Sequence, residues 1–236
     1  MRLTRATLEA IRFACLHFHY AKSVPVNPIG YNVYNDKDEW CGVILYAAGA
    51  NKSIGTQYGL PIGGALELVR VALNGKQEHT SQAVAMSLKQ LKKDVPICRL
   101  VVSYADCDQQ HLGTIYQATN WIYTGQENKG MVSAFIIHGK KTHKKTIHSH
   151  KVVIDGKKMP CPQTLEMVRR FLDPNAQEFR TSGKRKYLMP LDKKMKKQIA
   201  PLAKPYPKNE DWVKIDRAKF KVKEDTSQPE KGAENE

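Results

Sequence analysis

The sequence lacks the features that mark membrane-spanning, disulfide-rich and zinc-ribbon proteins. Among its 236 residues no apolar run comes near the roughly 18 residues that a membrane-spanning helix needs, and the longest runs have the length of strands. The five cysteines (Cys15, Cys41, Cys98, Cys107 and Cys161) are odd in number and form no CxxC pair, so we expect neither disulfides nor a zinc ribbon. The N-terminal segment has no long uncharged apolar stretch, so we read no signal peptide. Together these absences predict a cytoplasmic protein that has no membrane partner.

Glycine loops that bind nucleotides are also missing. The stretch from 49 to 64 holds five glycines, but their spacing matches neither a P-loop nor a GxGxxG fingerprint. Hydrophobic residues make up 41% of the chain, slightly below the average for globular proteins, which still allows the core of one large domain.

Negative charge is scarce, and positive charge is concentrated in one part of the chain. Lys and Arg number 38 against 23 Asp and Glu, which gives a net charge of +15. Residues 138–197 contain 17 Lys and Arg against 5 Asp and Glu, so this quarter of the chain carries +12 of that charge. Because a surface that neutralises phosphates must be basic, this cluster favours a nucleic-acid partner; the alternative is a solvated surface that only confers solubility.

The basic residues expected to contact phosphate lie in three dense segments of this region. They are Lys140, Lys141, Lys144, Lys145, Lys151, Lys184, Arg185, Lys186, Lys193, Lys194, Lys196 and Lys197, with Arg169 and Arg170 between the segments. Three histidines, His143, His148 and His150, have a spacing that could suit a metal. Lysines surround them and would repel a cation, so we interpret this segment as a phosphate-contacting loop.

The pattern of apolar residues predicts an α/β domain. Helices are expected at 4–19 (capped by Thr4), 81–93 and 113–119, and strands at 31–34, 40–47, 66–73, 98–104 and 121–123. Strands that alternate with helices over about sixty residues favour at least one parallel pairing. Further on, the sequence predicts a hairpin around 152–154, a helix at 162–171 and a helix that ends at Pro201. We therefore divide the chain into a core (1–137), a basic excursion packed on the same domain (138–207) and an extended to disordered tail (208–236).

Four blocks of sequence resemble the phage Mom family of DNA-modification proteins. They are FHYAKSVP (18–25), ELVRVALN (67–74), VSYADCDQQHLGTIYQATNWIYTG (102–125) and KYLMPLDKKMKKQIAPLAKPYP (186–207), in this order through nearly the whole chain. The order of helices and strands, and the segment GTIYQATNWIYTG, also resemble the GNAT acyltransferases. The fold expected from this resemblance is α/β: a GNAT-like mixed, partly parallel sheet flanked by helices, with a basic C-terminal excursion.

Resemblance to the Mom family implies a phage enzyme that adds a carbamoylmethyl group to adenine N6 in double-stranded DNA and so shields that DNA from host restriction enzymes. The donor is expected to be a small molecule or to be carried by tRNA; the candidates are acetyl-CoA with iron, and a glycyl donor such as glycyl-tRNA. GNAT enzymes hold the CoA pyrophosphate with a glycine-rich turn, and the corresponding segment here, NGKQEHTSQAVA (74–85), has a single glycine. Simple acyl transfer would give an amide, whereas carbamoylmethyl is joined through a CH2 group.

The same blocks contain polar residues at positions suited to catalysis. Asp106 ends an apolar strand, where a carboxylate can face a site, although it could instead cap the following turn. Tyr116 matches the position at which many GNAT enzymes keep a tyrosine acid, and Ser103 lies on the strand of Asp106; each could instead be a structural residue. His19 and Tyr20 follow the first helix, and His19 could be a general base, an iron ligand or a structural histidine.

Substrate-binding candidates also come from these blocks. Asn120, Trp121 and Gln117 could line a pocket for a flipped adenine, since an enzyme that acts on a base must unstack it; for Trp121 the alternative is core packing. Glu67 and Arg70 are three residues apart on one expected strand, which puts them on opposite faces and argues against a simple pair.

We therefore expect a GNAT-like DNA-modifying transferase with His19, Ser103, Asp106 and Tyr116 at its active site. One alternative is a GNAT-like acyltransferase whose acceptor is tRNA or another molecule that is not DNA. Another is a basic DNA-binding protein without catalytic activity.

Overall fold

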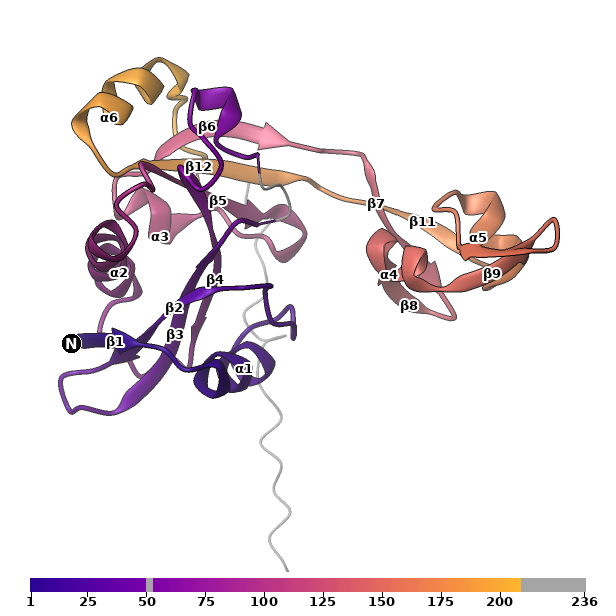
Figure 1. The fold of residues 1–236 in the computed structure, drawn as a ribbon, viewed down its shortest axis with the longest axis horizontal. Helices are drawn as coiled ribbons and strands as arrows, with labels where there is room; N and C mark the ends of the chain where they lie inside the picture. The colour runs from indigo at the N-terminus through magenta and orange to yellow at the C-terminus, as the bar shows by residue number, and fades with distance from the viewer. Residues whose placement is uncertain (50–52, 209–236) are drawn as a thin grey trace, which may run out of the picture. The chain divides into compact units, whose positions relative to one another are not determined.

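Seven strands form the main sheet of the computed structural model, which describes residues 1–49 and 53–208. In order across the sheet they are β1 (Arg2–Arg5), β2 (Ile29–Tyr34), β3 (Trp40–Ala47), β4 (Ala65–Leu73), β5 (Leu100–Asp106), β12 (Lys184–Pro190) and β6 (Ile122–Glu127) (Figure 1). Neighbouring strands are antiparallel except β4 and β5, which are parallel. This sheet and its flanking helices confirm the expected α/β fold class with a mixed, partly parallel sheet.

Helices flank the main sheet because its strands alternate apolar side chains between two faces. The helices are α1 (Leu8–His17), α2 (Thr80–Asp94), α3 (Thr114–Gln117) and α6 (Lys193–Ile199), with 3-10 turns at Thr56–Tyr58, Cys107–Gln109 and Ala200–Leu202. Along β3, Val43 and Leu45 share a buried cluster with α1, whereas Ile44 and Tyr46 share one with α2. Met195 of α6 lies in a third cluster with residues of β5 and β12. The period-2 pattern of β3 therefore places α1 and α2 on opposite sides of the sheet.

The expected helix at 4–19 is wrong at its start. Residues at the start of the chain form β1, in which Thr4 pairs with Asn32 of β2. Thr7 caps α1 instead, because its Oγ1 accepts a hydrogen bond from Ala10 N at 3.2 Å. The other expected elements of the core lie within a few residues of their predicted bounds.

A second, smaller apolar core lies in the insert, which we define as residues 128–183 between β6 and β12. The insert contains β7 (Val132–Ile137), β8 (Lys140–His143), α4 (Lys144–Ser149), β9 (Lys151–Ile154), β10 (Lys157–Pro160), α5 (Leu165–Phe171) and β11 (Gln177–Arg180). Strands β11, β7 and β8 form a three-stranded sheet, and β9 pairs with β10 as the expected hairpin. Phe135, Ile147 and Val168 are buried together among these elements. The insert therefore has a packed interior of its own.

Strand β12 lies in the main sheet, although the sequence pattern assigns its residues to the basic excursion. It runs between β5 and β6, and its Tyr187 and Leu188 are fully buried. Helix α6 follows and buries Met195 and Ile199 against the same core. Lysines on both sides of these apolar residues conceal the strand in the sequence, because its alternation is short and interrupted by charge.

The described residues up to Tyr206 form one compact unit. Of the second unit, Pro207–Glu236, the structure describes only Pro207 and Lys208, so the expected tail at 208–236 lies almost wholly outside the described residues. Within residues 1–49 and 53–208, no helix has the length and apolar character needed to cross a membrane.

Candidate active site

A cavity of about 290 Å³ opens where the two parallel strands of the main sheet separate. The pairing of β4 with β5 ends at Glu67 and Val102, although both strands continue beyond that point. Six residues that the sequence suggested for a site line this cavity: His19, Tyr20, Glu67, Arg70, Asp106 and Tyr116. The separation of two parallel strands at their carboxyl ends therefore brings together residues that are far apart in the chain.

Tyr116 lines the cavity and is hydrogen-bonded to Ser103, which is buried and does not itself line the cavity. The hydroxyl oxygens of Tyr116 and Ser103 are 2.8 Å apart, and Ser103 Oγ lies 3.0 Å from the carbonyl oxygen of Leu68. Ser103 Oγ is the donor towards both the Leu68 carbonyl and the Tyr116 hydroxyl, so the proton of Tyr116 is not used in this pair. Burial raises the pKa of Tyr116 to about 12, while the hydrogen bond with Ser103 opposes that rise. Tyr116 is therefore protonated at neutral pH and has a proton to give.

Asp106 is the last residue of β5, and its carboxylate is oriented by the turn that follows. Its Oδ1 accepts a hydrogen bond from Asp108 N at 2.9 Å, so the turn-capping role also considered for Asp106 is present. Tyr20 lies close by, and partial burial together with the negative charge of Asp106 raises the pKa of Tyr20. One carboxylate oxygen of Asp106 is thus fixed by the backbone while the side chain lines the cavity.

His19 is a neutral ring at the edge of the cavity. Burial, and then the positive charges of Arg70, His111 and Lys22, lower its pKa to about 4. His19 Nδ1 accepts a hydrogen bond from Ala21 N at 3.1 Å, which places the proton of the neutral ring on Nε2. In this arrangement His19 offers a hydrogen-bond donor to the cavity rather than a base.

The donor set does not fit the iron centre considered for His19. A ring whose Nδ1 accepts and whose Nε2 carries the proton has no lone pair left for a metal. In the part of the chain that the structure describes, no three His, Cys, Asp or Glu side chains are grouped so as to hold a metal ion.

A β-bulge reverses the expectation that Glu67 and Arg70 face opposite ways. Leu68 pairs with Tyr46 and Arg70 pairs with Leu45, so Val69 is the extra residue of β4. The extra residue shifts the alternation by one position, and Glu67 and Arg70 both line the cavity. The guanidinium of Arg70 donates to Val69 O at 2.7 Å through Nη1. Arg70 Nε is buried and has no hydrogen-bond partner among the described residues.

Asn120, Trp121 and Gln117 lie outside the cavity, which contradicts their expected place in a base pocket. Trp121 is fully buried and packs against the ring of Tyr116, with 5.0 Å between the centroids. Gln117 Nε2 donates to the hydroxyl of Tyr187 at 3.3 Å, and Asn120 is exposed in a turn with φ of 59°. The reason is geometric: α3 is a single turn that points Tyr116 inward, so its neighbours point elsewhere.

Sequence reasoning missed Tyr104, His111 and Ile115, which also line the cavity. Tyr104 lies on β5, and burial raises its pKa to about 12. All three belong to the block at 102–125 that carries Asp106 and Tyr116. Their nearness in the sequence to those two residues is the feature that could have identified them as cavity residues.

The basic residues divide into exposed ones and ones held by the core. Lys186 is only 6% exposed, and its Nζ pairs with Glu127 Oε1 at 3.1 Å, so it is not free to meet a phosphate at the surface. Arg185 donates to His111 O at 3.1 Å, and Lys184 lines the cavity. Exposed lysines are Lys140, Lys141, Lys145 and Lys151 in the insert, and Lys193, Lys194, Lys196 and Lys197 on α6; Lys144 is half-buried. Arg169 is tied to the insert through Ala176 O.

His143 has a structural role that the metal alternative did not consider. Its Nδ1 accepts a hydrogen bond from Lys145 N at 3.1 Å and so caps α4. Burial and the charges of neighbouring lysines lower the pKa of His143, which keeps the ring neutral.

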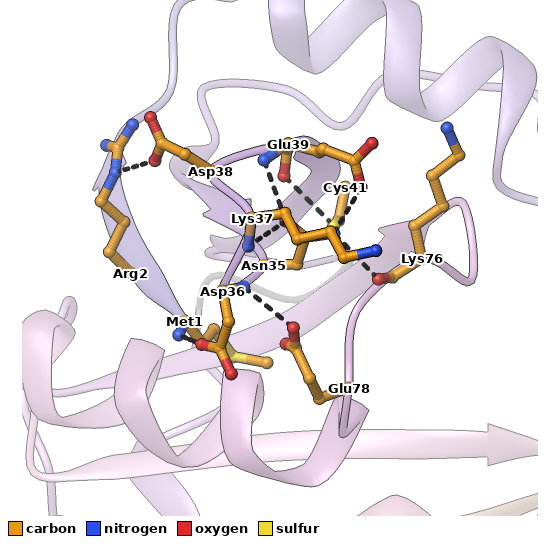
Figure 2. Close-up of polar contacts among 10 residues, drawn as sticks. All are labelled: Met1, Arg2, Asn35, Asp36, Lys37, Asp38, Glu39, Cys41, Lys76 and Glu78. Atoms are coloured by element: carbon orange, nitrogen blue, oxygen red, sulfur yellow. Dashed lines mark hydrogen bonds and ion pairs between the residues drawn. The ribbon is translucent and has the colours of Figure 1, made fainter.

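The loop before α2 is bonded to the turn between β2 and β3. Figure 2 shows Asn35 Nδ2 reaching Lys76 O, and Asp36 N reaching Glu78 Oε1, at 3.2 and 2.8 Å. The amide of Lys76 is already taken by Asn74 Oδ1 at 3.0 Å. The Glu78 carboxylate and the Lys76 amide are therefore both engaged in contacts within this loop or with the neighbouring turn.

Comparison with solved structures returns acetyltransferases at low similarity. They include a Bacillus subtilis acetyltransferase in complex with CoA (TM-score 0.43, 10% identity, 80% of this chain and 97% of that chain). They also include a spermidine/spermine N-acetyltransferase from Vibrio cholerae in complex with manganese ions (TM-score 0.42, 9% identity, 83% and 95%). A putative acetyltransferase from Acinetobacter baylyi follows (TM-score 0.40, 12% identity, 81% and 93%). Likenesses at this level carry nothing about the chemistry of the present chain.

The sequence itself matches one family. No curated protein matches the chain by sequence. The sequence model of the Mom protein family matches residues 2–208, a span that includes the main sheet, the cavity and the whole insert. This chain therefore belongs to the Mom protein family.

Proposed function

We propose that the protein is a transferase that converts adenine in double-stranded DNA to N6-carbamoylmethyladenine and thereby protects phage DNA from host restriction enzymes. The observation that carries the proposal is the match to the Mom family over residues 2–208. The cavity between β4 and β5 supports it, since that cavity gathers a carboxylate, a protonated tyrosine and a neutral histidine around one space.

The chemistry assigns a role to each of these groups. Adenine N6 is a weak nucleophile because its lone pair is delocalised into the ring, so attack requires a positioned acceptor for the N6 proton. The carboxylate of Asp106 takes that proton as N6 bonds to the methylene carbon of the donor, and the donor loses its leaving group. Tyr116 gives a proton to that leaving group, and Arg70 and the Nε2–H of His19 stabilise the developing negative charge.

The exposed basic residues hold the DNA duplex. An adenine must leave the base stack to enter a cavity of this kind, which requires the flanking phosphates to be held. The exposed lysines of the insert and of α6 are the groups suited to that task. Lys184 lines the cavity, so positive charge is also present at the site itself.

The atoms transferred in the reaction set the chemical requirements for the donor. It must carry a two-carbon unit that ends joined through CH2, with a leaving group on that carbon. Acetyl-CoA is a candidate source of the two carbons, but direct acetyl transfer would give an amide, so a further step would be needed. Neither iron nor glycyl-tRNA gains support from the contacts described above.

Nucleoside mass spectrometry on plasmid DNA from cells that express the chain tests the proposal. Wild-type protein is expected to give a carbamoylmethyl mass shift on deoxyadenosine, and Asp106→Asn is expected to give none. Asp155→Asn is a matched control, because Asp155 lies in the exposed turn of the β9–β10 hairpin at φ of 50°, a conformation that Asn also tolerates. Unmodified DNA from soluble wild-type protein would reject the proposal, and a modified tRNA pool would then favour the acyltransferase alternative.

A further inference from the structure

Asp108 lies two residues beyond Asp106 and is held by the insert. Its carboxylate accepts hydrogen bonds from Thr181 Oγ1 at 2.9 Å and from Ser182 N at 2.7 Å. It also pairs with Lys141 Nζ at 3.6 Å, and the Asp108 side chain is only 12% exposed. All three partners belong to the insert, whereas Asp108 belongs to the loop that follows β5.

The backbone amide of Asp108 orients the carboxylate of Asp106 at the cavity. Asp108 N donates to Asp106 Oδ1 at 2.9 Å and so fixes one oxygen of the cavity carboxylate. The loop then returns to Asp106, because His111 N donates to Asp106 O at 3.0 Å. Asp108 is thus bonded through its side chain to the insert and through its backbone to Asp106.

The rest of this loop is hydrogen-bonded to the end of the insert and to the start of β12. Cys107 N donates to Gly183 O at 3.1 Å, and Arg185 Nη1 donates to His111 O at 3.1 Å. Gly183 N in turn donates to Thr181 Oγ1 at 3.0 Å. Loop and insert therefore cannot move apart without breaking several hydrogen bonds, of which those to Asp108 include a buried charge.

The carboxylate of Asp108 is ionised at neutral pH. Burial by itself would raise its pKa, but the hydrogen bonds from Ser182 and Thr181 and the charge of Lys141 outweigh burial and lower it. Hydrogen bonds to a charged acceptor are shorter and stronger than those between neutral groups. The negative charge is therefore what makes this contact firm.

We propose that Asp108 is a positioning residue that couples the insert to the cavity. It holds the loop of residues 106–111 against residues 181–183, so that Asp106 keeps one orientation while the insert holds the phosphates of the duplex. This inference rests on the proposed function, since it takes adenine in DNA as the acceptor.

Asp108→Asn in the full chain tests the coupling. The amide keeps the shape of the side chain but removes its charge and replaces one acceptor oxygen by a donor. We expect kcat for DNA modification to fall between about tenfold and 100-fold, because a small displacement of a reacting group has that effect. DNA affinity is not expected to weaken and KM for DNA is not expected to rise, since Asp108 is not among the residues proposed to contact phosphate and its replacement releases Lys141. Glu178→Gln is the matched control, because Glu178 pairs with Arg180 on the surface of the same insert and should change neither quantity.

An unchanged kcat in Asp108→Asn, with measurable wild-type activity, would overturn the inference. A loss confined to KM and DNA affinity would overturn it too, because that result would mean a damaged insert rather than a displaced Asp106. If Asp108→Asn does not fold, Thr181→Val replaces it. That variant removes the hydrogen bond from Thr181 Oγ1 to Asp108 and the one that Oγ1 accepts from Gly183 N, and it is expected to lower kcat in the same way.

Hydrogen exchange gives an arm that does not depend on activity. The amides of residues 106–111 are expected to exchange faster in Asp108→Asn than in wild type, and the core amides of β3 are expected to exchange at the same rate. Equal exchange in loop 106–111 would refute the coupling. If wild-type protein modifies no DNA, the proposed function fails, and this exchange measurement alone decides the role of Asp108.

Discussion

Replacing Tyr116 with Phe separates the chemical role of this residue from its packing role. Its ring packs against Trp121 and Tyr187, with centroid distances of 5.0 and 5.1 Å, and a Phe ring keeps both contacts. The hydroxyl accepts a hydrogen bond from Ser103, and Ser103 can still donate to Leu68 O at 3.0 Å when that hydroxyl is gone. Tyr116→Phe therefore leaves no buried donor without an acceptor.

Tyr116→Phe should therefore have a small effect on stability and a large effect on the reaction rate. Loss of one buried hydrogen bond costs about 1 kcal/mol of unfolding free energy, whereas loss of a general acid lowers the rate by roughly 10²- to 10⁴-fold. Ser103→Ala provides the contrast, because it leaves the buried hydroxyl of Tyr116 without its hydrogen-bond partner. This variant is expected to lower the unfolding free energy by about 1–3 kcal/mol.

Urea unfolding followed by circular dichroism measures the first quantity, and nucleoside mass spectrometry on DNA measures the second. Full activity in Tyr116→Phe would refute the assignment of Tyr116 as the acid. A loss of unfolding free energy well above that of Ser103→Ala would refute the hydrogen-bond reasoning, because it would mean that the hydroxyl itself holds the fold.

Three further predictions concern charge. Replacing Lys140, Lys145 and Lys151 by Ala should weaken DNA binding and reduce the slope of log K against log salt by about 0.9 per lysine; an unchanged slope in a fluorescence titration would remove these residues from the phosphate contacts. The pKa of His19 is lowered from 6.5 to about 4, so the unfolded chain takes up a proton at a higher pH than the folded chain does. The free energy of unfolding should therefore fall as pH drops from 6.5 towards 4. His19→Asn should flatten this part of the plot of unfolding free energy against pH, and an unaltered plot would contradict the prediction. The hydrogen bond from Arg99 lowers the pKa of Asp192 from 3.8 to about 2. Ionised Asp192 therefore stabilises the fold fully above pH 3.8, and this stabilisation is lost as pH falls through about 2. Because Asp192 also caps α6 by accepting from Met195 N at 2.8 Å, Asp192→Ala should lower the unfolding free energy by about 1–2 kcal/mol, and an unchanged urea midpoint would show that the cap is dispensable.

The sequence by itself determined most elements of the core and six of the residues that line the cavity. Strand β3 has the bounds expected from its apolar run, because its residues are buried on both faces whatever their partners are. Asp106 was proposed because the end of a buried strand is readable from local pattern, and Tyr116 because its block resembles the GNAT enzymes. The positive charge of residues 138–197 is likewise a property of composition.

The tertiary structure decided what depends on pairing between distant segments. The bulge at Val69 puts Glu67 and Arg70 on one side, and it is visible only in the register of β4 against β3. Lys186 counts as one more basic residue in the sequence, and only its place between β5 and β6 makes it a buried partner of Glu127.

The position of β12 and the role of Asp108 have the same cause. A strand that returns to the sheet after the 128–183 insert has no local signal, since its neighbours in the sheet are distant in the chain. Asp108 has the sequence context of an ordinary turn residue, and its partners Thr181 and Ser182 are more than 70 residues away. Periodicity reports which face of an element is apolar, whereas hydrogen bonds and ion pairs between elements exist only once the chain has folded.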